Sequence, residues 1–361
     1  MARMECPPPP VPRLRFDPVT TPVAHPSPPP SAPPRLAYLD MTKGFLVIIM
    51  VIYHTLNYST QYYLAFRYIS FLPPSFIFIT GFLISAIYPN RYSSNDTKLY
   101  RRLFIRGLKL VVLFTLLNLA VRTLFGLAAH DLGRSLGEFF SRWTDVYLVG
   151  SGRTAIFEVL LPIGYFLLLS PLLLGLQRRH NGLLVLATAS LIGLCLLLQN
   201  LGIPCDNLNL VTVGALGMLC GLLPVAHERT LSRKSVWIGT LIAYALYFPL
   251  GVSQGYVYLV QLLGALTAVA LLLTSSTAVG EGGWLRNRII RLGQYSLVAY
   301  IVQIAILQVV LRIVGRQDPL SLELLAVFMV TLIVMTLLIE ATHALRRRMP
   351  PFETLYRVFF A

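Results

Sequence analysis

Long apolar runs recur along this chain and are separated by short polar segments rich in arginine and lysine. Each run has about 17–22 residues, the length that an α-helix needs to cross a hydrocarbon core of roughly 30 Å. The pattern predicts ten membrane-spanning helices, at residues 38–58, 72–89, 104–126, 155–176, 182–200, 207–224, 235–251, 256–275, 293–314 and 321–343. The predicted fold is therefore an all-α, polytopic integral membrane protein.

The composition agrees with a lipid environment. Of the 361 residues, 56% are hydrophobic and 12% are charged, whereas an ordinary soluble domain has about 25% charged residues. The net charge of +15 is expected to come from loops that contact membrane lipids, above all the anionic lipids of the inner surface. Nucleic-acid binding is not expected, because the pattern contains no soluble basic domain.

The basic residues lie mainly in the loops that follow the even-numbered spans. Cytoplasmic loops collect lysine and arginine, so this alternation predicts that both chain termini are cytoplasmic. The residues concerned are Arg91, Lys98, Arg101, Arg102, Arg106, Arg178, Arg179, Arg229, Arg233, Lys234, Arg286, Arg288, Arg291 and Arg346–Arg348. The loop after the fifth span differs, since it holds Asp206 with no base nearby.

Two terminal segments flank the predicted membrane domain, which covers residues 36–343. Thirteen of residues 1–34 are proline, so residues 1–35 are predicted to form a disordered, partly polyproline II tail in the cytoplasm. Residues 344–361 are predicted to be a basic cytoplasmic tail. The cysteines show no metal-binding spacing, and no metal site is expected; they are Cys6, Cys195, Cys205 and Cys220.

The first predicted span carries three polar side chains that share one side of the helix. Lys43 and His54 lie eleven positions apart, hence within roughly 20° of each other around an α-helix, and Asp40 lies close beside them. Ionisable residues inside a span are costly and usually functional. An imidazole has an unperturbed pKa of roughly 6.5, so His54 can take a proton from a hydroxyl or an amine during group transfer.

Four segments resemble the type-3 integral-membrane acyltransferases. Leu39-Asp40-x-x-Lys43-Gly44, followed by an apolar run that ends at His54, resembles their first helix. Residues 76–85, Phe-Ile-Phe-Ile-Thr-Gly-Phe-Leu-Ile-Ser, resemble a segment of their second helix. The basic run 101–106 and the segment 292–300 are similar to two further motifs of that family. Residues 157–165 are also similar to heparan-α-glucosaminide N-acetyltransferase-like and periplasmic-glucan succinyltransferase-like proteins.

The resemblance implies a multi-pass acyltransferase of the bacterial inner membrane. The expected reaction moves an acyl group, most simply acetyl, from cytoplasmic acyl-CoA to a carbohydrate or glycolipid acceptor at the outer face, as in the O-acetylation of a polysaccharide. Acyl-CoA is then a donor substrate, and no bound cofactor is expected. In this scheme the donor-binding residues are Asp40, Lys43, Arg101, Arg102 and Arg106.

The outer half of the membrane domain holds the remaining candidates. His54 is the expected general base. Glu158 lies within about one helical turn of the outer boundary, at a depth comparable to that of His54, and is expected to orient the imidazole. The acceptor-binding candidates are Tyr53, Asn57, Tyr58 and Arg153.

Two positions depart from the family pattern. Lys43 stands where the family has arginine. The point charge of an ammonium group therefore takes the place of a planar guanidinium group that can bind phosphate bidentately. Gln303 stands where a late histidine is common. Both changes are compatible with a different donor or with reduced activity.

Less specific interpretations stay open beside the enzyme. His54 can be a structural hydrogen-bonding residue, and Asp40 and Lys43 can simply pair with each other. Gly81 is expected to be a close helix-packing point. The alternative functions are a transporter or exporter that uses the intramembrane charges as a relay, and a catalytically silent scaffold.

Overall fold

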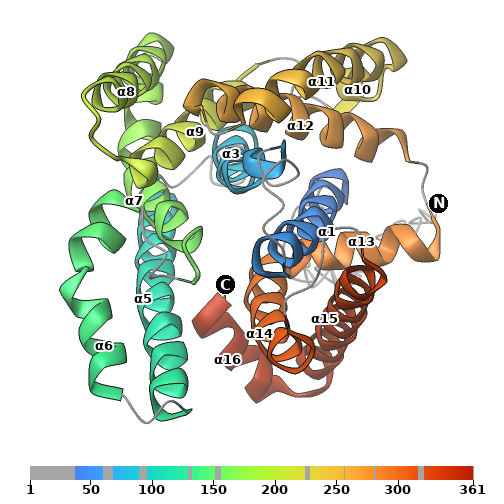
Figure 1. Cartoon of the computed structure of the whole chain (residues 1–361). Coiled ribbons are helices and arrows are strands. Elements are labelled where there is room, and N and C mark those ends of the chain that lie inside the picture. Colours follow the sequence, from blue (N-terminus) through green and yellow to red (C-terminus); the bar gives the residue numbers. More distant parts are fainter. Residues whose placement is uncertain are drawn as a thin grey trace, which may run out of the picture. The chain divides into compact units, whose positions relative to one another are not determined.

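The computed structural model describes residues 37–59, 68–88, 96–128, 132–150, 156–223, 228–255, 257–279, 282–315 and 321–360. These residues form helices joined by short connections, with no β-strand among them (Figure 1). The proline-rich tail predicted for residues 1–35 lies outside the described residues.

Nine helical segments in the described ranges are long and apolar enough to cross a membrane. The prediction of an all-α polytopic membrane protein is therefore confirmed. The helices concerned are α1 (Ala37–Ser59), α3 (Leu72–Ala86) with the preceding 3₁₀ turn η1 (Ile69–Phe71), α5 (Asp96–Ala128), α7 (Leu160–Arg179), α8 (Asn181–Asn200), α11 (Lys234–Gln254), α12 (Tyr258–Ala278), α14 (Ser296–Val314) and α15 (Leu322–Arg348).

The sixth predicted span forms a helix that is too short to cross a hydrocarbon core. It forms α9 (Asp206–Gly221), whose 16 residues rise about 24 Å at 1.5 Å per residue, less than a hydrocarbon core of roughly 30 Å. The helix packs against α3, α7 and α8, and much of its surface is buried. Because protein surrounds α9, its length need not match the thickness of the lipid.

Glycine residues allow α9 to approach α3 at backbone distance. A Cβ atom added to Gly81 on α3 would lie 2.0 Å from the carbonyl oxygen of Gly214 on α9. In the same interface, a Cβ atom on Gly217 would lie 2.1 Å from the carbonyl oxygen of Phe78. Small residues permit such close approach of membrane helices, so the predicted role of Gly81 in helix packing is confirmed.

A second close crossing joins α1 to the short helix α13 (Trp284–Gln294). A Cβ atom on Gly44 would lie 2.0 Å from the Ile289 carbonyl oxygen, and one on Gly293 would lie 1.7 Å from the Asp40 carbonyl oxygen. The crossing places the Asp40–Lys43 end of α1 directly on α13. Helices α12, α14 and α15 also pack on α1 (Figure 1).

The segment between α5 and α7, predicted as a loop, contains two helical elements: α6 (Leu132–Ser141) and the π-helix η2 (Asp145–Val149). Helix α6 packs back along α5. Side chains from three helices hold η2. The Tyr165 hydroxyl and the Asn207 amide donate to the Tyr147 carbonyl, and the Tyr147 hydroxyl shares a 2.7 Å hydrogen bond with Thr115.

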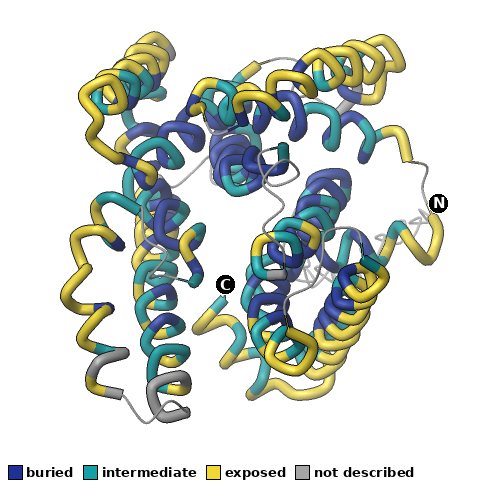
Figure 2. Tube along the Cα trace, in the orientation of Figure 1, coloured by how far each residue is buried: buried dark blue, intermediate teal, exposed yellow. Residues whose placement is uncertain are grey.

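Apolar side chains face outward on the peripheral helices, as expected for contact with lipid. Figure 2 shows exposed residues along much of α8 and α11, and large exposed side chains there include Val185, Leu186 and Leu246.

The segment predicted as a C-terminal tail continues α15 to Arg348 and then forms α16 (Pro350–Phe360). Glu353 of α16 accepts hydrogen bonds from Arg346 and Arg357.

Candidate active site

A cavity of about 730 Å³ lies between the helices that carry the predicted outer-face residues. Its lining comes from α1, η1, α3, α5, η2, α7, α9, α12, α14 and the short segments before α7. Ligand pockets in proteins typically measure about 300–1,000 Å³. The space is therefore large enough for a small organic substrate.

His54 of α1 lies in the wall of this cavity with only 6% of its surface exposed. Three tyrosine rings surround the imidazole: Tyr53 at 5.2 Å, Tyr58 stacked at 5.7 Å and Tyr300 at 5.8 Å between centroids. The enclosed Nδ1 atom has no hydrogen-bond partner among the described residues. Packing thus orients the ring, and Nε2 is the nitrogen left to face a substrate.

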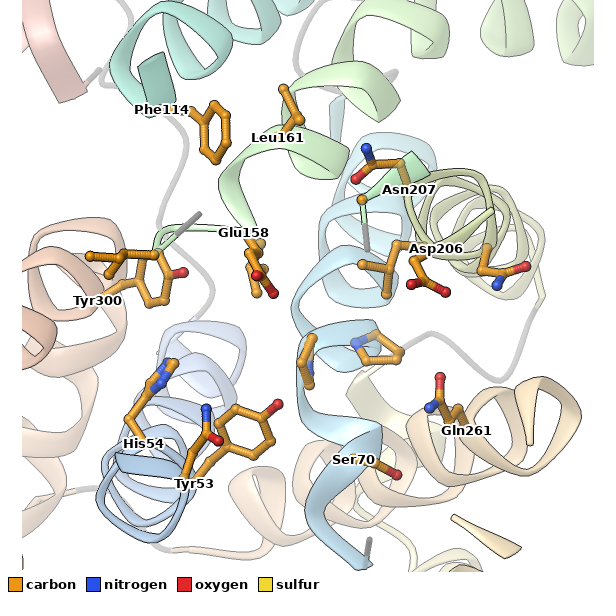
Figure 3. Close-up of a pocket in the computed structure, with 18 of the residues that line it drawn as sticks. Tyr53, His54, Ser70, Phe114, Glu158, Leu161, Asp206, Asn207, Gln261 and Tyr300 are labelled. Carbon is orange, nitrogen blue, oxygen red and sulfur yellow. The ribbon is translucent and has the colours of Figure 1, made fainter. Parts of the chain in front are cut away.

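Glu158 lies two residues before the membrane-spanning helix α7, and a buried amide of α5 fixes its position. The Asn118 Oδ1 atom accepts a 2.9 Å hydrogen bond from the backbone N–H of Ile156, while Nδ2 donates to the Phe114 carbonyl. Figure 3 shows the Glu158 carboxylate pointing into the cavity. Burial, followed by the negative charge of Asp206, raises the pKa of Glu158 to about 7.

Glu158 and His54 share the cavity but are not directly paired. No hydrogen bond or ion pair joins them in the described part of the chain. Both side chains line the cavity, and a bound substrate would occupy the space between them.

The predicted acceptor residues on α1 all reach this cavity, because Tyr53, Asn57 and Tyr58 lie on the turn of helix that carries His54. Their hydroxyl and amide groups can donate and accept hydrogen bonds. Arg153, the fourth acceptor candidate, lies outside the described residues.

The predicted donor residues lie elsewhere. Asp40 and Lys43 form an ion pair of 2.6 Å, with side chains 12% and 22% exposed, and neither lines the His54 cavity. Lys43 lies about 16 Å along α1 from His54, at 1.5 Å per residue. The three predicted donor-binding arginines, Arg101, Arg102 and Arg106, line a separate groove of about 260 Å³ near the start of α5. Lys98 and Ile105 complete its lining.

Several cavity residues were not predicted as site residues. Tyr300 belongs to the segment 292–300 that resembles a family motif, so the sequence could have indicated it as a site residue. Asp206 also carried a signal, as an isolated carboxylate in an outer loop. Ser70 and Gln261 carried none, because single polar residues at span ends are common and only the packing of α12 and η1 against α1 brings them to the cavity.

Gln303 occupies an enclosed position on α14, one turn beyond Tyr300. It is 0% exposed, and neither amide atom has a hydrogen-bond partner among the described residues. An amide does not titrate, so Gln303 cannot replace a histidine as a base. His54 is the histidine that lines the cavity among the described residues.

Comparison with protein-family models assigns a reaction class to this chain. A family model described as an acyltransferase domain matches residues 36–340. The chain therefore belongs to the acyltransferase 3 family and is an acyltransferase. No curated protein and no solved structure matches it significantly.

Proposed function

We propose that this membrane enzyme transfers an acyl group, most simply acetyl, from cytoplasmic acyl-CoA to a hydroxyl group of a carbohydrate or glycolipid at the outer face. One observation carries the proposal: a buried histidine, whose Nδ1 has no hydrogen-bond partner among the described residues, lies in the wall of a substrate-sized cavity that also holds Glu158. The family match supplies the reaction class, and the predicted inner-membrane location belongs to the same proposal.

The chemistry requires one proton acceptor and donors for an oxyanion. Nε2 of His54 takes the hydroxyl proton as the acceptor oxygen attacks the thioester carbonyl carbon. The carbon–sulfur bond then breaks, and the imidazolium returns the proton to the departing thiolate of coenzyme A. Tyr58 and Tyr300 place hydroxyl groups in the same region of the wall, where neutral donors can stabilise the oxyanion.

Glu158 stabilises the imidazolium that forms during this step. Its carboxylate points into the cavity that His54 lines, and a negative charge in a partly enclosed site favours the protonated ring. The amide groups of Asn57 and Gln261 in the same lining can hold the other hydroxyls of a sugar.

The donor is proposed to enter from the inner face. The pantetheine arm of coenzyme A is long and flexible, and the roughly 16 Å that separate Lys43 from His54 along α1 define the path that it would follow. Lys43 is held by Asp40 at 2.6 Å, so the charge that meets a donor phosphate or carboxylate is fixed in position. The arginine-lined groove of α5 provides further positive charge.

Substitutions at Lys43 separate this enzyme from a relay transporter. If Lys43 anchors the donor, Lys43→Met should raise the KM for acyl-CoA by about tenfold or more, because a charge-assisted contact is lost. Lys43→Arg should retain or improve donor binding. A relay requires Lys43 to change protonation, which arginine cannot do, so arginine would then be as damaging as methionine.

The measurement is donor-dependent labelling of the acceptor in inside-out vesicles, with release of coenzyme A followed in parallel. Asp40→Asn serves as a companion variant, since it removes the partner of Lys43 and keeps the lysine charge. Equal failure of the arginine and methionine variants, with no thioester consumption by the parent protein, would contradict the proposed function.

A further inference from the structure

The described residues that line the His54 cavity carry acidic but no basic side chains. Glu158 and Asp206 both line it, and no lysine or arginine is found among the described lining residues. Its other polar lining residues include Asn57, Ser70, Asn209 and Gln261, which are neutral. A ligand in this space therefore meets two carboxylates together with uncharged hydrogen-bonding groups.

Asp206 is an exposed residue at one side of this space. It is the first residue of α9, and its neighbour Asn207 donates hydrogen bonds to the carbonyl oxygens of Val146 (3.3 Å) and Tyr147 (3.1 Å). Figure 3 shows Asp206 on the opposite side of the cavity from Tyr300, with Glu158 between them. Within the described residues, no hydrogen bond or ion pair engages the Asp206 carboxylate.

His54 provides an independent indication that a ligand belongs here. Its side chain is more than nine-tenths buried, it faces the same cavity, and its Nδ1 atom has no partner in the described part of the chain. A base, two carboxylates and several neutral polar residues thus surround one space.

We propose that Glu158 and Asp206 make this cavity select acceptors that are uncharged or carry an amine over acceptors that carry a carboxylate or phosphate, and that Asp206 is a specificity-determining residue. The inference rests on the proposed function, because it treats the cavity as the acceptor site.

The physical reason is the energy of like charges in a partly enclosed space. Glu158 and Asp206 are both exposed at the cavity wall, so a bound acceptor can approach both carboxylates. An anionic acceptor would add a third negative charge close to them, and the combined repulsion should lower its occupancy by about tenfold or more. Neutral hydroxyl groups instead donate hydrogen bonds to the carboxylates, and an ammonium group pairs with them.

The selectivity should depend on pH. Burial and the charge of Asp206 raise the pKa of Glu158 to about 7, so Glu158 is largely ionised at pH 8 and largely protonated at pH 6. Discrimination against anions should therefore be stronger at pH 8. Asp206→Asn should weaken it at both values.

A cysteine placed in the cavity tests the charge without relying on catalysis. Gln261→Cys puts a thiol in the lining, and Ser253→Cys puts one at an exposed position at the end of α11. Purified full-length protein in detergent is treated with cationic and anionic methanethiosulfonate reagents, which form a mixed disulfide and release methanesulfinate. The modification rate of each introduced cysteine is the rate measured for the variant minus the rate measured for the parent protein.

The expected result at pH 8 is a cation-to-anion rate ratio at least about tenfold higher for Gln261→Cys than for Ser253→Cys. Adding Asp206→Asn should lower the Gln261→Cys ratio several-fold, whereas Asp206→Glu should preserve it. Equal ratios at the two positions, no response to Asp206→Asn, or no reaction of Gln261→Cys with either reagent would overturn the inference. Asn209→Cys replaces Gln261→Cys if that variant does not fold.

Acceptor competition then links the charge to the reaction. A neutral methyl hexoside, the matching methyl uronide and the matching amino sugar are offered together with labelled acetyl-CoA. The neutral and amino sugars should be acylated at least about tenfold faster than the uronide, and Asp206→Asn should reduce that preference. If thioester is consumed but Asp206→Asn leaves the preference over the uronide unchanged, the inference about Asp206 is overturned and the proposed function stands. Absence of thioester consumption with every acceptor counts against the proposed function, while the cysteine ratios still decide the cavity's charge.

Discussion

His54→Ala is expected to lower acyl transfer by about 10²–10⁴-fold, the range for loss of a general base. The side chain is buried in the cavity wall, and its Nδ1 atom has no protein partner in the described residues. Its removal therefore breaks no hydrogen bond of Nδ1 among those residues. The membrane level and thermal stability of the variant should stay close to those of the parent protein. The measurement is thioester-dependent labelling of the acceptor at matched protein levels.

Thr55→Val is the matched control for this variant. Thr55 is the next residue on α1, is 2% exposed, and has an enclosed hydroxyl without a partner among the described residues. It does not line the cavity. Transfer should persist in Thr55→Val. Near-parental turnover in His54→Ala would show that the histidine is structural.

Gly81→Leu is expected to prevent stable folding of the membrane domain. The Cβ atom alone would lie 2.0 Å from the Gly214 carbonyl oxygen and 3.0 Å from the Met218 nitrogen, both backbone atoms of α9. Backbone atoms cannot rotate away, so α3 and α9 must separate. The expected cost is roughly 3 kcal/mol or more, at the upper end of what overpacking causes.

The readout is the midpoint of thermal unfolding in detergent, together with the amount of monodisperse protein. Gly193→Leu is the control, because Gly193 lies on the exposed surface of α8 with nothing within 4 Å of an added Cβ atom. Similar midpoints for the two variants would contradict the close α3–α9 contact.

The membrane helices could be predicted from hydropathy, because lipid imposes a minimum length on any helix that faces it. That rule fails for α9, which is enclosed by other helices and has only 16 residues. The helical elements α6 and η2 were also missed, since tertiary hydrogen bonds to Tyr147 from Tyr165 and Asn207 stabilise η2 and leave no hydropathy signal.

Within the site, the residues on α1 could be predicted because helix periodicity alone places Tyr53, His54, Asn57 and Tyr58 within about one and a half turns. The position of Glu158 depends on a long-range hydrogen bond, from the Ile156 N–H to Asn118 on another helix. Periodicity cannot reveal such a contact. Asp206 was visible only as an unpaired loop carboxylate, and the packing of α9 places it beside Glu158.

The central claim is that an acyl group crosses the bilayer while coenzyme A stays on the cytoplasmic side. The test uses proteoliposomes in which a cleavable tag after Ala361 reports the orientation of each molecule. Acetyl-CoA carrying different labels on its acetyl and nucleotide parts is supplied only on the side of the C-terminus, and the sugar acceptor only on the opposite side. The account predicts acetyl label on the acceptor and all nucleotide label on the donor side. Nucleotide label crossing the membrane, or acceptor labelling only when both substrates share one side, would contradict it.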